Sequence, residues 1–337
     1  MSTLLQKLSK NLFNSIYVEE QAYNYPVVRM VLEKYTDIPV ITIRNYKDVF
    51  NRGNQCFQLQ KHRQSLILAV KSSPFLYKGP EVCQDFGYSD FYYASFLLNC
   101  IFDCDYCYLQ GMYPSANIVA FVNIDEFKKE IENTLGGKKA YLAVSYDTDL
   151  IGFHNVISYW DFLQDFFTQY PDINVEIRTK SANTVFYNEF SPAENIVIAF
   201  SLAPQEIIQK FERLTPSLAA RIKAVKAAVS RGFKVRLCFD PVIINSGSEK
   251  LYEPFFRNLF TEINPDKLKD VGYGFFRMSK DFFKRIEKQK NNSQLYADEY
   301  SIKDDIVSYP PELMEMVTAS HLKVLEEYLS KEKIFTL

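Results

Sequence analysis

Strand-like apolar segments alternate with amphipathic helices along residues 92–277, and this alternation restricts the fold more than any other feature of the chain. Strands separated by helices form a parallel sheet with right-handed crossovers. Six such units favour a full or partial β/α barrel, in which chemistry takes place at the carboxyl ends of the strands. A doubly wound open sheet is the alternative, although no G-x-G-x-x-G follows the first strand as in dinucleotide-binding folds. The expected strands are residues 92–98, 141–144, 175–178, 196–202, 235–239 and 271–277.

The helices between these strands carry recognisable start and stop residues. The clearest one opens at Thr215-Pro216, because proline suits the first helical position, where its missing N–H would be unpaired anyway. Gly232 ends this helix. Two further helices are expected over residues 125–135 and 157–170. The apolar stripe of the clearest helix consists of Leu218, Ile222, Val225 and Val229.

Three regions are expected along the chain. Residues 1–85 are interpreted as a mixed, mainly helical region that packs on the barrel, with a helix over 27–35 and a short strand over 38–43. Residues 86–290 are assigned to the barrel, and residues 291–337 to a helical C-terminal extension.

The composition is that of a globular protein. Hydrophobic residues make up 47% of the 337 residues and charged residues 24%, which excludes disorder as the main state. The apolar runs are too short for a transmembrane helix, and residues 1–14 lack the apolar core of a secretory signal. We therefore expect a cytoplasmic protein without a membrane partner.

Charge is unevenly distributed along the chain. The net charge is −2, but residues 201–290 contain 18 Lys and Arg against 10 Asp and Glu, a local excess of 8. A basic segment of this kind can face phosphates. It can equally consist of solvated helix faces, and charge alone leaves both interpretations open.

Three of the six cysteines fall within eight residues. Cys100, Cys104 and Cys107 have the spacing C-x3-C-x2-C, on a loop that follows the first predicted strand. Three thiolates at this spacing can bind three irons of a [4Fe–4S] cluster. The fourth iron then keeps an open position, which S-adenosylmethionine (SAM) can chelate, and an electron from the cluster cleaves SAM to a 5′-deoxyadenosyl radical.

A structural zinc site is the alternative interpretation of these cysteines. Zinc normally takes a fourth Cys or His ligand close by. The three histidines, His62, His154 and His321, all lie far from the cluster in sequence. The spacing therefore favours iron–sulfur chemistry, and Tyr106, the aromatic residue just before the third cysteine, agrees with it.

Residues 100–110, CIFDCDYCYLQ, resemble the spore photoproduct lyase family of radical SAM enzymes. Three later stretches agree in order: Arg178-Thr179-Lys180, Phe200-Ser201, and Phe211-Glu212 followed by Thr215. The resemblance covers residues 17–282 at low overall similarity. It implies a partial (β/α)6 TIM-like barrel of the radical SAM type. It also implies repair of UV-damaged DNA, in which the carbon–carbon lyase reverts 5-thyminyl-5,6-dihydrothymine (spore photoproduct) to two thymines.

The resemblance also implies roles for individual residues. Cys100, Cys104 and Cys107 would bind the cluster. Tyr106 would lie near the adenine of SAM, and Tyr108 near the lesion, where it would relay a hydrogen atom. The remaining cofactor-binding positions would be Ser145, Asp147, Lys180 and Ser201.

One departure from the family pattern concerns the hydrogen-atom donor. Well-known members carry a cysteine at the end of the second strand, whereas residues 144–148 contain none. A serine O–H bond is too strong to replace a thiol in that step. Cys83, which lies 17 residues before Cys100, is the best candidate donor, and Cys56 is second. Cys238 lies in an apolar strand and is assigned to the core.

Partners follow from the same resemblance. Extruding a lesion from duplex DNA requires phosphate contacts, for which Arg277, Lys280, Lys284 and Arg285 are candidates. A low-potential electron donor such as ferredoxin or flavodoxin would reduce the cluster. Two alternatives stay open: a family relative that modifies another nucleic acid or a peptide, and an iron–sulfur protein that binds nucleic acid without turnover.

Overall fold

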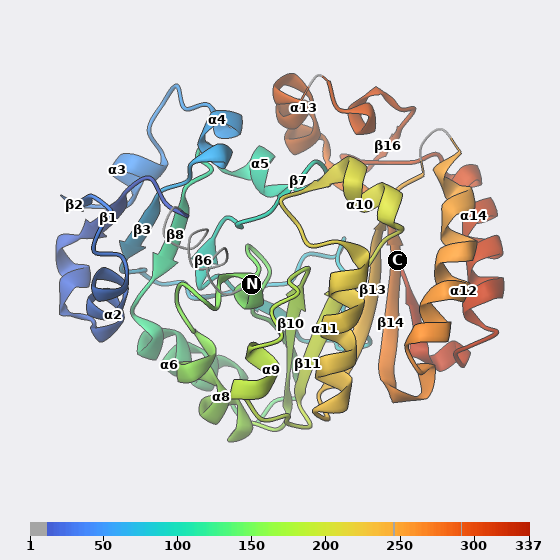
Figure 1. Ribbon diagram of the computed structural model, residues 1–337, viewed down its shortest axis with the longest axis horizontal. Helices are drawn as coiled ribbons and strands as arrows, with labels where there is room; N and C mark the ends of the chain where they lie inside the picture. The colour runs from blue at the N-terminus through green and yellow to red at the C-terminus, as the bar shows by residue number, and fades with distance from the viewer. Residues whose placement is uncertain (1–11, 245–246, 291) are drawn as a thin grey trace.

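Six parallel strands form the centre of the molecule. The computed structural model describes residues 12–244, 247–290 and 292–337. Its largest sheet has the strand order β18-β14-β13-β11-β10-β9-β5-β4, and the neighbours from β5 to β14 all pair in parallel (Figure 1). This sheet is the predicted partial (β/α)6 barrel, with β4 and β18 as its edges. The six strands are β5 Phe91–Ala94, β9 Ala140–Ala143, β10 Ile173–Thr179, β11 Ile196–Ser201, β13 Lys234–Val242 and β14 Leu268–Phe275.

Helices connect the successive barrel strands. In the helix after β11, Ser217 accepts a hydrogen bond from the backbone N–H of Ala220, with Pro216 directly before it. Gly232 follows that helix with a φ of 85°, a conformation that glycine adopts without strain. Among the described residues, no helix is long and apolar enough to cross a membrane. The connecting helices are α6 Ile124–Leu135, α8 Trp160–Thr168, α9 Phe186–Glu189, α11 Leu218–Ser230 and α12 Tyr252–Glu262.

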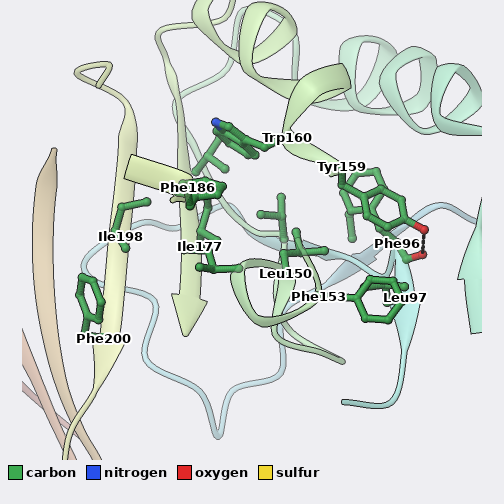
Figure 2. Packing of buried hydrophobic residues seen from close by; sticks show 14 of the residues in the cluster. Phe96, Leu97, Leu150, Phe153, Tyr159, Trp160, Ile177, Phe186, Ile198 and Phe200 are labelled. Atoms are coloured by element: carbon green, nitrogen blue, oxygen red, sulfur yellow. Dashed lines mark hydrogen bonds between the residues drawn. The ribbon is translucent and has the colours of Figure 1, made fainter. Parts of the chain in front are cut away.

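The barrel strands and their helices enclose an aromatic-rich core. Ile177 of β10 and Ile198 of β11 lie beside Phe186 of α9, and all three side chains are buried (Figure 2). Tyr159 is buried as well, and its hydroxyl donates to the carbonyl oxygen of Phe96 at 3.3 Å (Figure 2). Burying apolar surface stabilises a fold by about 25 cal/mol per Å², so this layer fixes the helices on the sheet.

A second, smaller sheet is built mainly from the N-terminal region. Its order is β2-β1-β3-β8-β6, and all pairs except β6 with β8 are parallel. The sequence predicted one of these early strands and a region richer in helix. β3 and β8 were missed because they are fully buried runs without alternation, in a region with no regular succession of strands and helices to place them. The elements are β1 Ile16–Glu19, β2 Val40–Ile43, β3 Leu66–Ala69, β6 Leu97–Leu98, β8 Ile118–Phe121, α2 Pro26–Lys34, α3 Lys47–Phe50 and α4 Phe57–His62.

The two sheets are interleaved along the chain. The predicted strand 92–98 is in fact two strands: β5 belongs to the barrel, and β6 turns into the smaller sheet. Conversely, β4 (Leu76–Lys78) lies before residue 85 but pairs with β5. The expected boundary at residue 85 therefore coincides with the limit of neither sheet.

The C-terminal part also contributes strands. β18 (Ile334–Thr336) pairs with β14 of the barrel, so residues 291–337 are more than a helical extension. β15, β17 and β16 form an antiparallel sheet beside the barrel. The remaining elements are β7 Asp103–Cys104, α5 Leu109–Met112, α7 Leu150–Phe153, α10 Gln205–Phe211, β12 Glu212–Arg213, β15 Arg277–Ser279, α13 Lys280–Gln289, β16 Ser301–Lys303, β17 Ile306–Ser308, α14 Pro311–Leu325, and short 3-10 helices at Glu20–Asn24, Ser248–Leu251, Pro265–Lys267, Gln294–Ala297 and Lys331–Lys333.

A fully buried guanidinium ties four barrel strands together. Arg236 of β13 has no exposed surface. Its Nη1 donates to Glu176 at 2.8 Å and to the Tyr141 hydroxyl at 3.1 Å, and its Nη2 donates to Asp270 at 2.8 Å. Every charge in this network is paired, which is the condition for burying it.

Removing this guanidinium should destabilise the barrel strongly. Arg236→Met removes the cation that is fully buried with Glu176 and Asp270 and leaves them the half-buried Arg178 and Lys269, so we expect a loss of about 3–5 kcal/mol in the free energy of unfolding. Urea titration followed by circular dichroism measures it. The control is Lys226→Met, which breaks the exposed pair with Glu262 at 2.8 Å and should cost about 0–1 kcal/mol. Equal losses in the two variants would contradict a structural role for the network.

The same network makes stability depend on pH. Burial alone would raise the pKa of Glu176, but the Arg178 and Arg236 guanidinium groups outweigh it and hold that pKa at about 2. The depressed pKa contributes stability above the unfolded value of about 4.3, and this contribution is lost as pH falls toward 2. In Arg236→Met the acid-induced loss of structure should therefore begin at a higher pH than in the parent.

Candidate active site

A cavity of about 480 Å³ opens at the mouth of the barrel. It is lined by residues at or just beyond the carboxyl ends of the parallel strands, where this architecture places chemistry, and by the cysteine loop. All the predicted site residues except Asp147 line it. The lining includes Cys83, Cys100, Cys104, Tyr106, Cys107, Tyr108, Ser145, Asp149, Lys180, Ser201, Asp240 and Arg277.

The cysteine loop has little regular structure of its own. Its two-residue strand β7 pairs antiparallel with β12, which sets Cys104 opposite Glu212. The backbone N–H of Cys107 donates to the carbonyl oxygen of Cys104 at 3.2 Å. These contacts turn the loop so that Cys100, Cys104 and Cys107 all reach the cavity.

Charged residues from distant segments hold this loop. Lys290 Nζ lies 3.2 Å from Asp103 Oδ1 and 2.8 Å from Asp105 Oδ1, and it is almost fully buried. Arg213 contacts the same two carboxylates, each at 3.1 Å. Ser293 Oγ donates to Asp105 Oδ2 at 2.7 Å. The two aspartates that flank Cys104 are thus fixed from both sides.

The thiols fit an iron–sulfur cluster better than a single metal ion. Burial raises the pKa of Cys100 to about 12 and also raises the pKa values of Cys104 and Cys107, so iron must displace their protons when it binds. Within the described residues, no three Cys, His, Asp or Glu side chains converge on one point as a mononuclear site requires. A cluster takes each thiolate on a different iron, which suits three separate thiols around one cavity.

A buried ion pair positions Tyr106. The Tyr106 hydroxyl donates to Glu212, which forms a buried ion pair with Arg221, and the Arg221 Nη1 donates to the carbonyl oxygen of Ser201 at 3.1 Å. Lys180 Nζ lies over the Tyr106 ring, 5.4 Å from its centroid. The sequence assigned no role to Glu212 or Arg221. Glu212 belongs to the matched Phe211-Glu212 segment, but that match does not indicate its contact with Tyr106. Arg221 is a charged residue on the apolar side of α11, and this position is the sequence signal that could have identified it.

Three predicted cofactor positions meet in the cavity. Ser145 is buried, and its Oγ has no hydrogen-bond partner among the residues that the structure describes, so it is available to a bound molecule. Burial would lower the pKa of Lys180, but the Cys104 thiolate and the Glu212 carboxylate outweigh this effect and raise it. The backbone N–H of Lys180 donates to Asp149 Oδ2 at 2.7 Å, and this hydrogen bond fixes the position of the lysine. Ser201 completes the group at the end of β11.

Asp147 lies outside the cavity lining, contrary to its predicted role at the cofactor. Its carboxylate is buried and accepts hydrogen bonds from Ser95 and, at 3.2 Å, from the Tyr108 hydroxyl. That hydroxyl also contacts the carbonyl oxygen of Tyr146 at 2.8 Å. Asp147 therefore orients Tyr108, and Asp149, two residues later, is the carboxylate that lines the cavity.

Cys83 reaches the cavity from the loop before β5. Its Sγ lies 3.6 Å from the Tyr146 hydroxyl. Burial raises the pKa of the Cys83 thiol, so it keeps its proton at neutral pH. Cys56 is exposed and outside the cavity lining, and Cys238 is buried in β13.

The candidate phosphate contacts differ in accessibility. Arg277 is engaged already: its Nη1 pairs with Asp240 Oδ1 at 2.9 Å, and its Nε donates to the carbonyl oxygen of Val82 at 2.7 Å. Lys284 and Arg285 on α13 are exposed, whereas Lys280 is half-buried. Arg277 therefore holds the loop that carries Cys83.

A partial (β/α)6 barrel with a C-x3-C-x2-C loop at its mouth defines a radical SAM enzyme. A family model described as spore photoproduct lyase matches residues 12–312. The chain belongs to the spore photoproduct lyase family. Two curated spore photoproduct lyases are similar over 84% of this chain and 84% of their own length: that of Bacillus subtilis at 22% identity over 295 residues, and that of a Geobacillus species at 20% over 294.

Solved structures of spore photoproduct lyase share the fold. One, complexed with dinucleoside spore photoproduct, matches with a TM-score of 0.80 at 16% identity and covers 97% of this chain and 98% of its own. A variant with bound AdoMet and dinucleoside spore photoproduct matches with a TM-score of 0.79 at 17% identity, over 96% and 98% of the two chains. The architecture is thus common to proteins whose sequences differ at most positions.

Loss of one loop thiol should abolish cluster binding. We expect Cys104→Ala to lose most of its iron and its absorbance near 400 nm after anaerobic reconstitution, because two thiolates cannot retain the cluster. Iron and sulfide per chain measure the loss. Cys56→Ala, which changes an exposed thiol outside the cavity, is the matched control and should keep the iron content of the parent. Full iron in Cys104→Ala would contradict the assignment.

Proposed function

We propose that this chain is a radical SAM carbon–carbon lyase that reverts 5-thyminyl-5,6-dihydrothymine in UV-damaged DNA to two thymines. The observation that carries the proposal is one cavity lined by three loop thiols, an unpartnered Ser145 hydroxyl and a separate thiol at Cys83. Family membership supports it, as does the binding of dinucleoside spore photoproduct by a protein of the same fold.

Cys100, Cys104 and Cys107 would hold a [4Fe–4S] cluster, and Ser145, Lys180 and Ser201 would bind SAM. Together these groups supply a 5′-deoxyadenosyl radical that abstracts a hydrogen atom from the lesion. Lys180 presents a cation to the SAM carboxylate, since its backbone is held by Asp149 and its ammonium lies over Tyr106. Tyr106, whose hydroxyl donates to Glu212, would lie near the adenine. Asp147 acts through Tyr108 rather than on the cofactor.

Cys83 would give a hydrogen atom to the product radical. In this step the S–H bond breaks, a C–H bond forms on the thymine, and a thiyl radical remains on Cys83. The raised pKa of the thiol keeps its hydrogen in place at neutral pH. Arg277 positions the donor by binding the carbonyl oxygen of Val82. Tyr108, hydrogen-bonded to the carbonyl of Tyr146, would relay a hydrogen atom beside it.

The proposal includes partners and a compartment. Exposed Lys284 on α13 is available for phosphates of damaged DNA, whereas the exposed Arg285 also donates to the carbonyl oxygen of Gly111 at 3.1 Å. A low-potential donor, ferredoxin or flavodoxin, would supply the electron. An enzyme that repairs chromosomal DNA with such a donor works in the cytoplasm.

One observation favours a second candidate. No cysteine lies at the end of the second barrel strand, so the hydrogen-atom donor lies at a different position from that in well-known family members. A family relative acting on another nucleic acid or on a peptide would share every other feature of the site.

Direct assay separates these functions. Anaerobically reconstituted protein with dithionite and SAM should consume spore photoproduct in UV-irradiated dry DNA, with thymine followed by chromatography and mass spectrometry. 5′-Deoxyadenosine formed without loss of the lesion would favour another substrate. An intact cluster with no cleavage of SAM would favour a non-catalytic iron–sulfur protein.

Replacing the candidate donor should divert the reaction. We expect Cys83→Ala to consume the lesion but to form at least tenfold less thymine, with radical adducts in its place, because no nearby S–H bond quenches the product radical. Quantifying thymine and adducts per lesion consumed tests this. Cys238→Ala, at a buried thiol in β13, controls for loss of a cysteine. An unchanged thymine yield would exclude Cys83 as the donor.

A further inference from the structure

A buried lysine lies against the backbone of the cysteine loop. Lys61, on α4, is 6% exposed, and its Nζ donates to the carbonyl oxygen of Cys100. Gln64 donates to the same oxygen at 3.2 Å, which fixes the contact from a second side. Lys61 has no part in the cluster, cofactor and substrate contacts proposed above.

Lys61 lacks the carboxylate partner that a buried ammonium normally requires. Lys290, the other buried lysine at this loop, contacts both Asp103 and Asp105. Among the described residues, Lys61 forms no ion pair with an Asp or Glu, and its Nζ donates to a backbone carbonyl oxygen instead. Burial of an ammonium is costly unless an opposite charge lies near.

The opposite charge is available at the three cysteines. Lys61 Nζ donates to the carbonyl oxygen of Cys100, and Cys100, Cys104 and Cys107 line one cavity. All three loop thiols are therefore within electrostatic reach of this one ammonium. A [4Fe–4S] cluster held by three thiolates carries a net negative charge that grows when the cluster is reduced, and net charge and nearby groups set its potential.

We propose that Lys61 is the counter-charge of the iron–sulfur cluster and raises its reduction potential by stabilising the reduced, more negative state. The inference rests on the proposed function only in requiring that the loop holds a cluster. Lys61 contacts the backbone of the loop rather than substrate or cofactor, so its effect is electrostatic.

Redox titration of charge variants tests this proposal. In anaerobically reconstituted Lys61→Met, followed by electron paramagnetic resonance of the reduced cluster, we expect the midpoint to become more negative. A tenfold fall in the reduction equilibrium constant is 59 mV for one electron. Lys61→Arg keeps the charge and should stay close to the parent. Lys223→Met, at an exposed lysine of α11, controls for loss of a lysine elsewhere.

The outcomes are distinct. Full iron and an unchanged midpoint in Lys61→Met would overturn the counter-charge role. If Lys61→Met loses iron, Lys61→Gln decides the cause, because it keeps an N–H donor without the charge: a midpoint equal to that of Lys61→Arg would overturn the proposal, and a more negative one would support it. Loss of iron in both Lys61→Met and Lys61→Arg would assign Lys61 to packing and overturn the proposal. A parent protein that binds no cluster at all would instead contradict the proposed function.

Discussion

An irregular loop cannot hold three thiols in place through its own backbone, and the rest of this molecule supplies the missing constraints. The barrel provides β12, whose pairing with β7 is only two residues long. The C-terminal part provides Ser293, which donates to Asp105, and the N-terminal part provides Lys61, which binds the carbonyl oxygen of Cys100. Each of the three parts of the chain thus contributes a contact to the same eight residues.

Burial explains why these contacts are ionic. The loop places Asp103 and Asp105 in the interior, where a carboxylate without a partner would cost several kcal/mol. Lys290 and Arg213 satisfy both carboxylates. The arrangement repeats deeper in the barrel, where Arg236 neutralises Glu176 and Asp270. In both places, paired charges fix the relative positions of segments that apolar contacts alone would allow to shift.

The barrel could be predicted from the sequence because each of its strands and helices shows the hydrophobic pattern typical of its type. The residues at the strand ends, such as Lys180 and Ser201, followed from the barrel assignment combined with the family motif. Asp147 does not line the cavity, because β9 ends at Ala143 and the turn that follows directs this carboxylate to Ser95 and Tyr108, which a motif match does not reveal. Residues that act across the fold, Glu212 and Arg221 among them, were missed because their contacts depend on tertiary packing. The early strands β1 and β3 were missed because they lie outside the regular alternation of strands and helices.

The contact between Lys290 and Asp105 spans 185 positions of the chain. A ribosome releases the cysteines long before it releases residue 290, and domains fold from the N-terminal side as synthesis proceeds. During that interval the nascent chain exposes three thiols on a loop that nothing yet fastens from the C-terminal side. The loop can therefore gain its full set of contacts only after residue 290 has left the ribosome.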